Sequence, residues 1–197
     1  CKKRWFSRTP NHKWDVVAID CGIKYSFIRQ LNAKGCNVTI VPYNSKPEEI
    51  MAFNPDGIFV SNGPGNPADA AVVCETLQAL RGKRPIFGVD LGHQIIAMSY
   101  GAKNERLKFG HHGCNHPVKC LDNDKLEIVS QNHNFVVNEE SLAGTPLTVT
   151  HRNLLDGTIA GIESVADKVF SVQYQPDCSP EASSTYLFDK FIKLMEE

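Results

Sequence analysis

Residues 88–94, "GVDLGHQ", place a carboxylate at a turn where a nucleophile could stand. The stretch follows the apolar run "PIFGV" and precedes a helical-looking segment. Gly88 and Gly92 are small enough for the sharp strand-to-helix turn that exposes the nucleophile of many hydrolases. Asp90 forms the tip of this turn, and the N–H of Leu91 behind it would stabilise a developing oxyanion at a helix N-terminus. The spacing therefore predicts an acyl-transfer site in which Asp90 is the nucleophile, has a reassigned role or is inactive.

A second turn with chemical potential is "SNGPGNP" at residues 61–67. Glycine allows a positive φ and a close backbone approach, and proline stiffens the loop, so its N–H groups can be aimed at a ligand. Gly63 would supply a second oxyanion donor, and Gly65 would let a substrate approach the backbone. Taken alone, the motif is equally compatible with an ordinary tight turn between a strand and a helix.

The elements around these turns predict the fold. From Trp14 onward, apolar strands alternate with amphipathic helices, which is typical of a parallel sheet covered on both faces with sites at the carboxyl ends of its strands. The later strands are shorter, which predicts an antiparallel or mixed extension before a last core-facing helix. The predicted strands are 15–20, 37–43, 56–61 and 85–90, then 116–121, 125–133, 147–153, 157–163 and 169–175. The predicted helices are 26–35, 47–53, 72–82, a segment after residue 90, and 183–197.

Length and composition exclude several classes of protein. A chain of 197 residues fits one domain, and 21 basic against 22 acidic residues, with a net charge of -1, indicate neither a nucleic acid nor a membrane partner. The cysteines lack the spacing of a metal site, so we expect reduced thiols, no metal and a cytosolic protein. Residues 1–13 are predicted to be a linker remnant before a domain at 14–197. The absence of an initial Met indicates a fragment or a processed product.

Motifs spread along the chain resemble the class I, triad-type glutamine amidotransferases. They most resemble the C-terminal glutaminase domain of the carbamoyl-phosphate synthetase small subunit, in register from about Trp14 to the C-terminus. The segment "KFGHHGCNHPV" after "GAK" is distinctive of that subunit. The supporting motifs are "IDCGIK", "PDGIFVSNGPGNP", "GHQIIAMSYGAK", "LKFGHHGCNHPV", "SQNHNF", "DGTIAGIE" and "FSVQYQP".

The resemblance implies a fold, a reaction and a partner. The fold is a flavodoxin-like open, mostly parallel sheet with helices on both faces and a small antiparallel extension. The reaction is glutamine hydrolysis, which supplies ammonia for carbamoyl phosphate in pyrimidine or arginine biosynthesis, with no cofactor in this domain. The partner is the large, ATP-using subunit or domain of the synthetase. The resemblance also implies an N-terminal domain in the family's small subunit, which we expect to lie outside these 197 residues.

The family's catalytic triad is altered at all three positions. A cysteine thiolate should attack the glutamine amide, a histidine should move the proton, and a glutamate two residues later should orient the histidine. By position these residues are Asp90, Gln175 and Asp177, with Gly63 and Leu91 as oxyanion donors. An amide cannot act as a base at neutral pH. Asp90, with a reference pKa of ~3.9, is expected to be ionised and to occupy the oxyanion donors itself, and Asp177 has no histidine to orient. The resemblance therefore predicts a silenced glutaminase.

The glutamine-binding positions are only partly retained. Gln94, Asn132 and Phe135 stand where the family contacts glutamine. Asn134 replaces a glycine at which backbone should approach the ligand, and "SPEAS" at 179–183 replaces an "SPGP" turn. These substitutions count against glutamine binding as well as against catalysis.

Alternative roles for the altered site follow from the same residues. Asp90 could be a new nucleophile assisted by a histidine, although structural or interface roles are favoured for each candidate. Asp90 and Asp177 could hold a metal, but the sequence offers no third ligand at a defined spacing. The domain could also retain glutamine hydrolysis, sense an amino acid without turnover, act as a structural partner of an ammonia-using synthetase, or be an unrelated flavodoxin-like domain. The candidate histidines are His93, His111, His112, His116 and His133.

Overall fold

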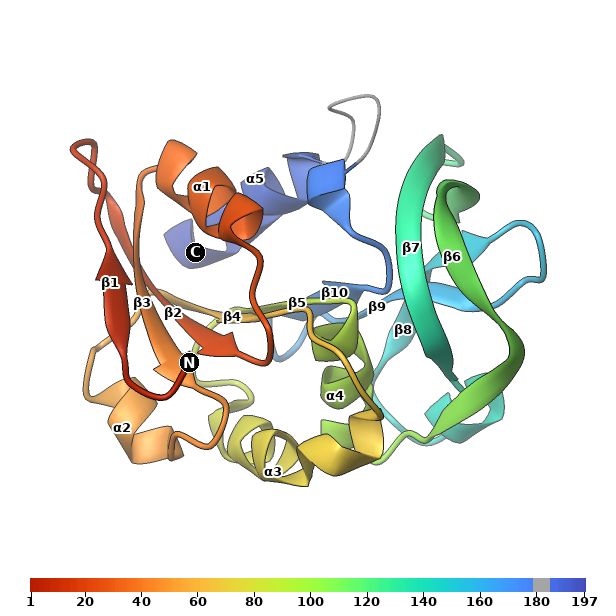
Figure 1. Ribbon diagram of the computed structural model, residues 1–197, viewed down its shortest axis with the longest axis horizontal. Coiled ribbons are helices and arrows are strands. Elements are labelled where there is room, and N and C mark those ends of the chain that lie inside the picture. The colour runs from red at the N-terminus through yellow and green to blue at the C-terminus, as the bar shows by residue number, and fades with distance from the viewer. Residues whose placement is uncertain (179–184) are drawn as a thin grey trace.

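The computed structural model describes residues 1–178 and 185–197, except for the side chain of Cys178, so the "SPEAS" segment lies outside the described residues. Within these ranges, ten strands form one sheet in the order β1-β3-β2-β4-β5-β10-β9-β8-β6-β7 (Figure 1). The strands are β1 (Trp5–Ser7), β2 (Trp14–Asp20), β3 (Cys36–Pro42), β4 (Gly57–Val60), β5 (Ile86–Val89), β6 (Asn104–Cys120), β7 (Leu126–Val137), β8 (Thr148–Asn153), β9 (Ile159–Ser164) and β10 (Val169–Val172). The helices are α1 (Tyr25–Ala33), α2 (Pro47–Met51), α3 (Ala71–Leu80), α4 (Leu91–Ser99) and α5 (Tyr186–Glu196), with short 3-10 turns η1 (Pro67–Ala70), η2 (Glu139–Leu142) and η3 (Pro176–Cys178).

The parallel half of the sheet consists of β3, β2, β4, β5 and β10. Every residue of β4, β5 and β10 is buried, as expected for strands covered on both faces. Because parallel strands end at one edge, the loops that follow Asp20, Val60, Val89 and Val172 are brought together. The predicted α/β fold is confirmed as a mixed sheet, and the carboxyl edge of its parallel half carries the candidate site.

Helices cover both faces of this sheet and create two cores. In Figure 1, α1 and α5 lie on one side of the strands, and α2, α3 and α4 lie on the other. The first core packs residues of α1 and α5 around aromatic strand residues, including the stacked rings of Phe87 and Phe170 at a centroid distance of 4.5 Å. The second core packs α2, α3 and α4 against the opposite face. The elbow is therefore held between two packed layers.

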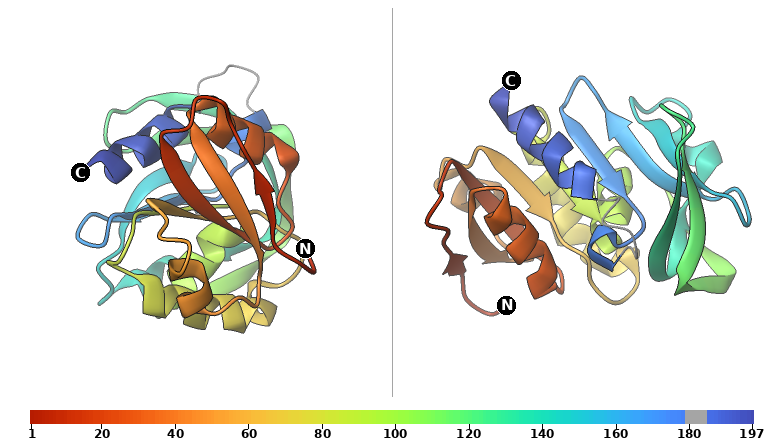
Figure 2. Two further views of the ribbon diagram at one scale, coloured as in Figure 1. Left: turned by 90° about the vertical axis from the view of Figure 1, so that its left-hand side faces the viewer. Right: turned by 90° about the horizontal axis from the view of Figure 1, so that it is seen from above.

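The antiparallel extension begins at β10, which pairs parallel with β5 and antiparallel with β9. Strands β8, β6 and β7 continue it, and the β6–β7 hairpin ends the sheet opposite β1 (Figure 2). Strand β6 spans Asn104–Cys120, whereas the sequence predicted only 116–121. The missed part contains two register shifts, between Arg106 and His111 and between Gly113 and His116. Bulges and glycines break the alternation by which a strand is recognised.

The first residues of the chain add an edge strand. Trp5, Phe6 and Ser7 of β1 pair antiparallel with Ile40, Thr39 and Val38 of β3. Part of the segment predicted as a linker remnant thus extends the sheet, and the domain start at residue 14 stays a prediction. No helix within 1–178 or 185–197 is long and apolar enough to cross a bilayer.

Candidate active site

The elbow is a sharp turn between β5 and α4. Asp90 has φ 56° and ψ -111°, a backbone conformation that is rare for a non-glycine residue. The turn brings α4 so close to β4 that a Cβ on Gly92 would lie 2.3 Å from the carbonyl oxygen of Val60. A Cβ on Gly88 would lie 2.3 Å from Cδ1 of Ile96. The two glycines are therefore required by close approach, and the elbow keeps its strand-to-helix form.

Gly92→Ala is expected to destabilise the domain more than Gly88→Ala. The new methyl at position 92 meets a backbone oxygen that cannot move without disturbing β4, whereas the methyl at position 88 meets the end of a flexible isoleucine side chain. Overpacking in a core costs about 1–3 kcal/mol, so we expect values near the upper end for Gly92→Ala and near the lower end for Gly88→Ala. Urea unfolding of both variants measures the order, and the reverse order would contradict the steric argument.

Asp90 is buried, with 5% of its surface exposed. Burial raises the pKa of Asp90 to about 7. Hydrogen bonds from Gln175 and from the N–H of Leu91, with the positive charge of Lys24, partly offset this effect. The pKa of Asp90 thus lies well above the reference value on which the expectation of an ionised carboxylate was based, because burial was not visible in the motif.

Lys24 lies among the three candidate triad positions. Its Nζ donates a hydrogen bond to Oε1 of Gln175 and lies 3.7 Å from Oδ2 of Asp177. The hydroxyl of Ser26 also donates to Oδ2 of Asp177. Asp177 has no histidine to orient, and its partners in the structure are a lysine and a serine. An ammonium that contacts an amide oxygen and a carboxylate does not form a nucleophile with a base.

A row of glutamine amides connects the elbow to the antiparallel extension. Gln94 Nε2 donates to the carbonyl of Phe135 at 2.7 Å and to Oε1 of Gln173 at 3.0 Å. Gln173 Nε2 in turn lies 3.4 Å from Oδ1 of Asp90. Both N–H groups of the Gln94 amide are therefore used within the protein, and only its oxygen is left to meet a ligand.

Asn132 and Asn134, two further candidate substrate contacts, are exposed on strand β7 of the β6–β7 hairpin. Asn132 Oδ1 lies 2.7 Å from Nδ1 of His112, and Asn134 Oδ1 lies 3.2 Å from Nε2 of the same ring. Gly63 packs against Cys21 and Leu91, where a Cβ would lie 2.0 Å from the Cys21 carbonyl oxygen. The structure thus places Gly63 beside the elbow and the two asparagines around His112.

The histidines do not provide Asp90 with a base. His93 is fully buried behind the elbow, and its Nδ1 lies 2.9 Å from Oγ of Ser171. Burial lowers the pKa of His93 to about 3. Over residues 1–178 and 185–197, none of the histidines is hydrogen-bonded to Asp90, and no group of three or more metal-ligating side chains could hold a metal ion. These observations favour neither Asp90 as a nucleophile assisted by a histidine nor a metal site formed by Asp90 and Asp177.

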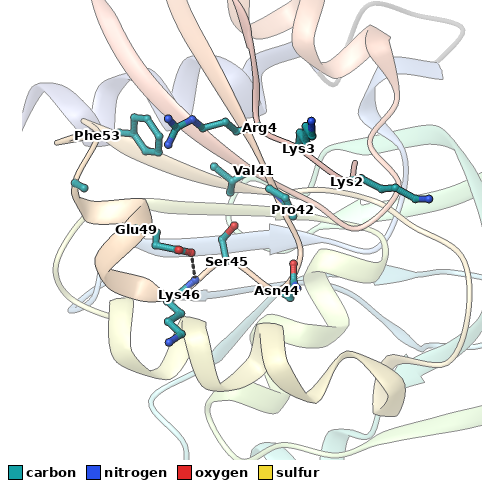
Figure 3. A pocket seen from close by; sticks show the side chains of 11 residues that line it. Lys2, Lys3, Arg4, Val41, Pro42, Asn44, Ser45, Lys46, Glu49 and Phe53 are labelled. Atoms are coloured by element: carbon teal, nitrogen blue, oxygen red, sulfur yellow. Dashed lines mark hydrogen bonds between the residues drawn. The ribbon is translucent and has the colours of Figure 1, made fainter.

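Two cavities lie on the β1 side of the carboxyl edge. One of about 510 Å³ touches Leu91 and Gly65, and Cys21 also lines it. Another of about 860 Å³ lies between the N-terminal arm, β3 and α2, and Figure 3 shows Lys2, Lys3, Arg4 and Lys46 along it. None of the predicted site residues lines this larger cavity. The smaller cavity thus reaches Leu91 and Gly65, whereas the triad positions do not line it.

Sequence reasoning missed three residues of the site, namely Lys24, Ser26 and Gln173. Lys24 ends "DCGIK", the loop after β2, and Gln173 begins "QYQP", the loop after β10. Their position after strands of the parallel sheet was a usable signal, because such loops meet at one edge. Ser26 lies within α1, and nothing in its sequence context indicated a contact with Asp177.

Comparisons with known proteins agree with this architecture. Residues 17–194 match the family model of the class I glutamine amidotransferases. The carbamoyl phosphate synthase small chain of Staphylococcus haemolyticus is 49% identical over 183 residues, covering 92% of this chain and 50% of the relative. That of Chlorobaculum tepidum is 49% identical over 198 residues, covering 98% and 54%. The chain thus spans about half the length of the curated relatives it matches.

A solved structure shows the same fold. A putative GMP synthase subunit from Thermoplasma acidophilum superposes with a TM-score of 0.78 at 20% sequence identity, covering 94% of this chain and 95% of that one. The family match extends from β2 to α5 and so includes the elbow, both flanking loops and the antiparallel extension. The chain belongs to the class I glutamine amidotransferases.

Proposed function

We propose that this chain is the glutaminase-type domain of a carbamoyl phosphate synthase small chain in which glutamine hydrolysis is disabled. The high identity to small chains of that name supports this identification. The cluster of Asp90, Gln175 and Lys24 supports the loss of activity, and this one observation carries the proposal. We extend the proposal to residues 14–197 as the domain, with 1–13 as part of a joining segment.

The chemistry of the family reaction explains why this cluster is inactive. Glutamine and water give glutamate and ammonia, which requires a nucleophile, a group that takes and returns a proton, and free oxyanion donors. Gln175 has no useful proton affinity and its oxygen already accepts from Lys24. The interaction with the N–H of Leu91 lowers the pKa of Asp90, so the carboxyl group is expected to compete for this oxyanion donor. An attack by Asp90 on the amide would form an anhydride whose hydrolysis lacks a positioned base.

The role that remains is structural. We propose that the domain serves as a partner of a large, ATP-using synthetase subunit or domain that draws on free ammonia. A sensor of glutamine is the weaker alternative, because the N–H groups of Gln94 and the carbonyl of Phe135 already pair within the protein. Titration calorimetry with glutamine separates the two roles, since a sensor requires saturable binding.

The purified chain is expected to release no ammonia from glutamine above the uncatalysed rate. Both the nucleophile and the base are missing, and each of these functions contributes orders of magnitude to the rate. A coupled ammonia assay measures the release, with the small chain of Staphylococcus haemolyticus as a positive control. Turnover that Asp90→Ala abolishes would overturn the proposal, because it would show that the elbow carboxylate is catalytic.

A further inference from the structure

A row of hydrogen-bonding side chains crosses the β6–β7 hairpin toward the elbow. His111 Nε2 lies 2.7 Å from Oδ2 of Asp156, whose side chain is 38% exposed. The side-chain amide of Gln131 lies 3.1 Å from Nδ1 of His111 and 2.7 Å from Nε2 of His133. Nδ1 of His133 lies 2.9 Å from the carbonyl oxygen of Phe135. Partly exposed and deeply buried groups are thereby joined without a gap.

The carbonyl of Phe135 fixes the proton position on His133. A carbonyl oxygen only accepts hydrogen bonds, so Nδ1 of His133 must carry the proton. Burial lowers the pKa of His133 to about 3, and the ring is therefore neutral. A neutral imidazole has one protonated nitrogen, so Nε2 of His133 must be an acceptor. Its partner on Gln131 must then be a donor.

The amide group of Gln131 satisfies this requirement in one orientation only. Its two ends have the same shape, and hydrogen bonding decides which of them faces the rings. With Oε1 toward both rings, the NH₂ group is left buried without a partner. With NH₂ toward both rings, one proton goes to Nε2 of His133 and the other to Nδ1 of His111, and a carbonyl without a partner is the better tolerated alternative. His111 then carries its proton on Nε2 and donates it to Asp156.

We propose that Asp156 and Gln131 are positioning residues for the candidate glutamine site. Asp156 accepts the Nε2 proton of His111 and so fixes the tautomer of this ring. Gln131 donates to Nδ1 of His111 and to Nε2 of His133, which couples the two tautomers. His133 and Gln94 both donate to the carbonyl of Phe135, at 2.9 Å and 2.7 Å, which saturates this acceptor. The side chain of Gln94 is thereby held with its oxygen free and its nitrogen turned away from the ligand side.

The row reaches the elbow through one more amide. Gln94 donates to Gln173 at 3.0 Å, and Gln173 lies 3.4 Å from Asp90. In this order Gln131 donates to both rings, His111 donates outward to Asp156, Gln94 donates to Phe135 and Gln173, and Gln173 donates to Asp90. Nδ1 of His111 also lies 3.4 Å from the amide nitrogen of Asn153, a second donor at this acceptor. The relevance of Gln94 to glutamine rests on the proposed function, whereas the tautomers can be measured without any ligand.

Long-range ¹H–¹⁵N spectra of the histidine rings test the assignment on the whole chain. We expect opposite neutral tautomers, with the proton of His133 on Nδ1 and that of His111 on Nε2. A His133 ring protonated on Nε2, or two rings with the same tautomer, would overturn the proposal. Ammonia release and glutamine binding are separate measurements, so failure here is distinguishable from failure of the proposed function.

Substitutions at Gln131 and Asp156 test whether the hydrogen bonds of these side chains, rather than the space they fill, determine the tautomers of His111 and His133. Gln131→Glu keeps the shape but offers only acceptors, so the proton of His133 should move to Nε2 or the ring should become doubly protonated. Asp156→Asn should leave His111 as a mixture of tautomers and shift the Nε2 signal of His133. Asp124→Asn, at a turn of the same hairpin with its ion pair to Lys119, is the matched control and should leave both rings unchanged.

The variants also define the contrary outcome. If Gln131→Glu fails to fold, Asp156→Asn and Gln131→Leu still test whether these residues position His133. Asp156→Asn keeps a polar side chain at a partly exposed position. Gln131→Leu fills the core with an apolar side chain. Gln131→Leu should preserve the Nδ1 proton of His133 and move its Nε2 signal toward that of an unbonded nitrogen. Unchanged His133 signals in both variants would show that Gln131 and Asp156 do not position the ring.

Discussion

The double variant Asp90→Cys, Gln175→His is expected to hydrolyse glutamine much faster than either single variant. The elbow supplies the turn, with Leu91 at the start of α4 and Gly63 packed beside it, so a thiol at position 90 is expected to stand at the predicted nucleophile position. An imidazole at position 175 would replace an amide that is already hydrogen-bonded to the Asp90 carboxyl group. The two substitutions therefore restore the nucleophile and the base together.

The size of the effect follows from general base catalysis. A positioned base contributes ~10²- to 10⁴-fold, so the double variant should exceed Asp90→Cys alone by a factor in that range. Asp177 remains near position 175 but is held by Ser26 and lies 3.7 Å from Lys24, so it must release one of these partners to orient an imidazole. Adding Asp177→Glu is expected to raise the rate further, because the longer side chain reaches past this cluster.

Ammonia release from glutamine measures the recovery in the unaltered protein, in both single variants and in the double variant, with and without Asp177→Glu. Gln175→His alone serves as the matched control, since it adds the imidazole without a thiol. Urea unfolding of every variant shows that the fold is retained. A folded double variant without activity, and still without activity after Asn134→Gly, would contradict the view that the triad substitutions are what disable the site.

The elbow and the sheet could be predicted from the sequence because their signals are local. Apolar runs of strand length, separated by amphipathic segments, predict parallel strands, and the glycines at 88 and 92 predict a sharp turn. The fold class follows from that alternation. Strand β6 was underestimated because its bulges and glycines remove the alternation from the region before residue 116.

The environment of the site could not be predicted in the same way. The pKa of Asp90 depends on how completely the surrounding layers exclude water, and a motif carries no such information. The contacts of Lys24 with Gln175 and Asp177 join residues about 150 positions apart, as the separation of 151 for the first pair shows. Side-chain reach and helix placement determine these contacts, so only the shared edge of the sheet was predictable.

Asp90→Asn is expected to stabilise the domain at and above neutral pH. Burial raises the pKa of Asp90 to about 7 in the folded protein, against ~3.9 in an unfolded chain. The folded state therefore binds more protons between these values, and ionisation of Asp90 costs stability that grows as the pH rises. The cost is absent below the unfolded pKa and complete above the folded pKa. A shift of three units corresponds to about 4 kcal/mol at pH 8.

The pH dependence of the difference between the two proteins isolates this effect. The advantage of Asp90→Asn should grow by about 1.4 kcal/mol per pH unit between pH 4 and 7 and stay level above that range. His93, His133 and His151, whose pKa values burial lowers to about 3, 3 and 4, destabilise both proteins in acid, since their neutral form is favoured in the folded state. Their contribution cancels in the comparison.

Asp124→Asn is the matched control for this substitution. Asp124 has φ 59°, close to the 56° of Asp90, so both changes place an asparagine at a positive φ. Asp124 is exposed, and hydrogen bonding to Lys119 lowers its pKa, so the control should show no gain in stability with rising pH. Urea unfolding at half-unit steps from pH 4 to 8 provides the curves. An advantage of Asp90→Asn that is constant with pH would show that Asp90 titrates normally and that the elbow does not bury a carboxyl group.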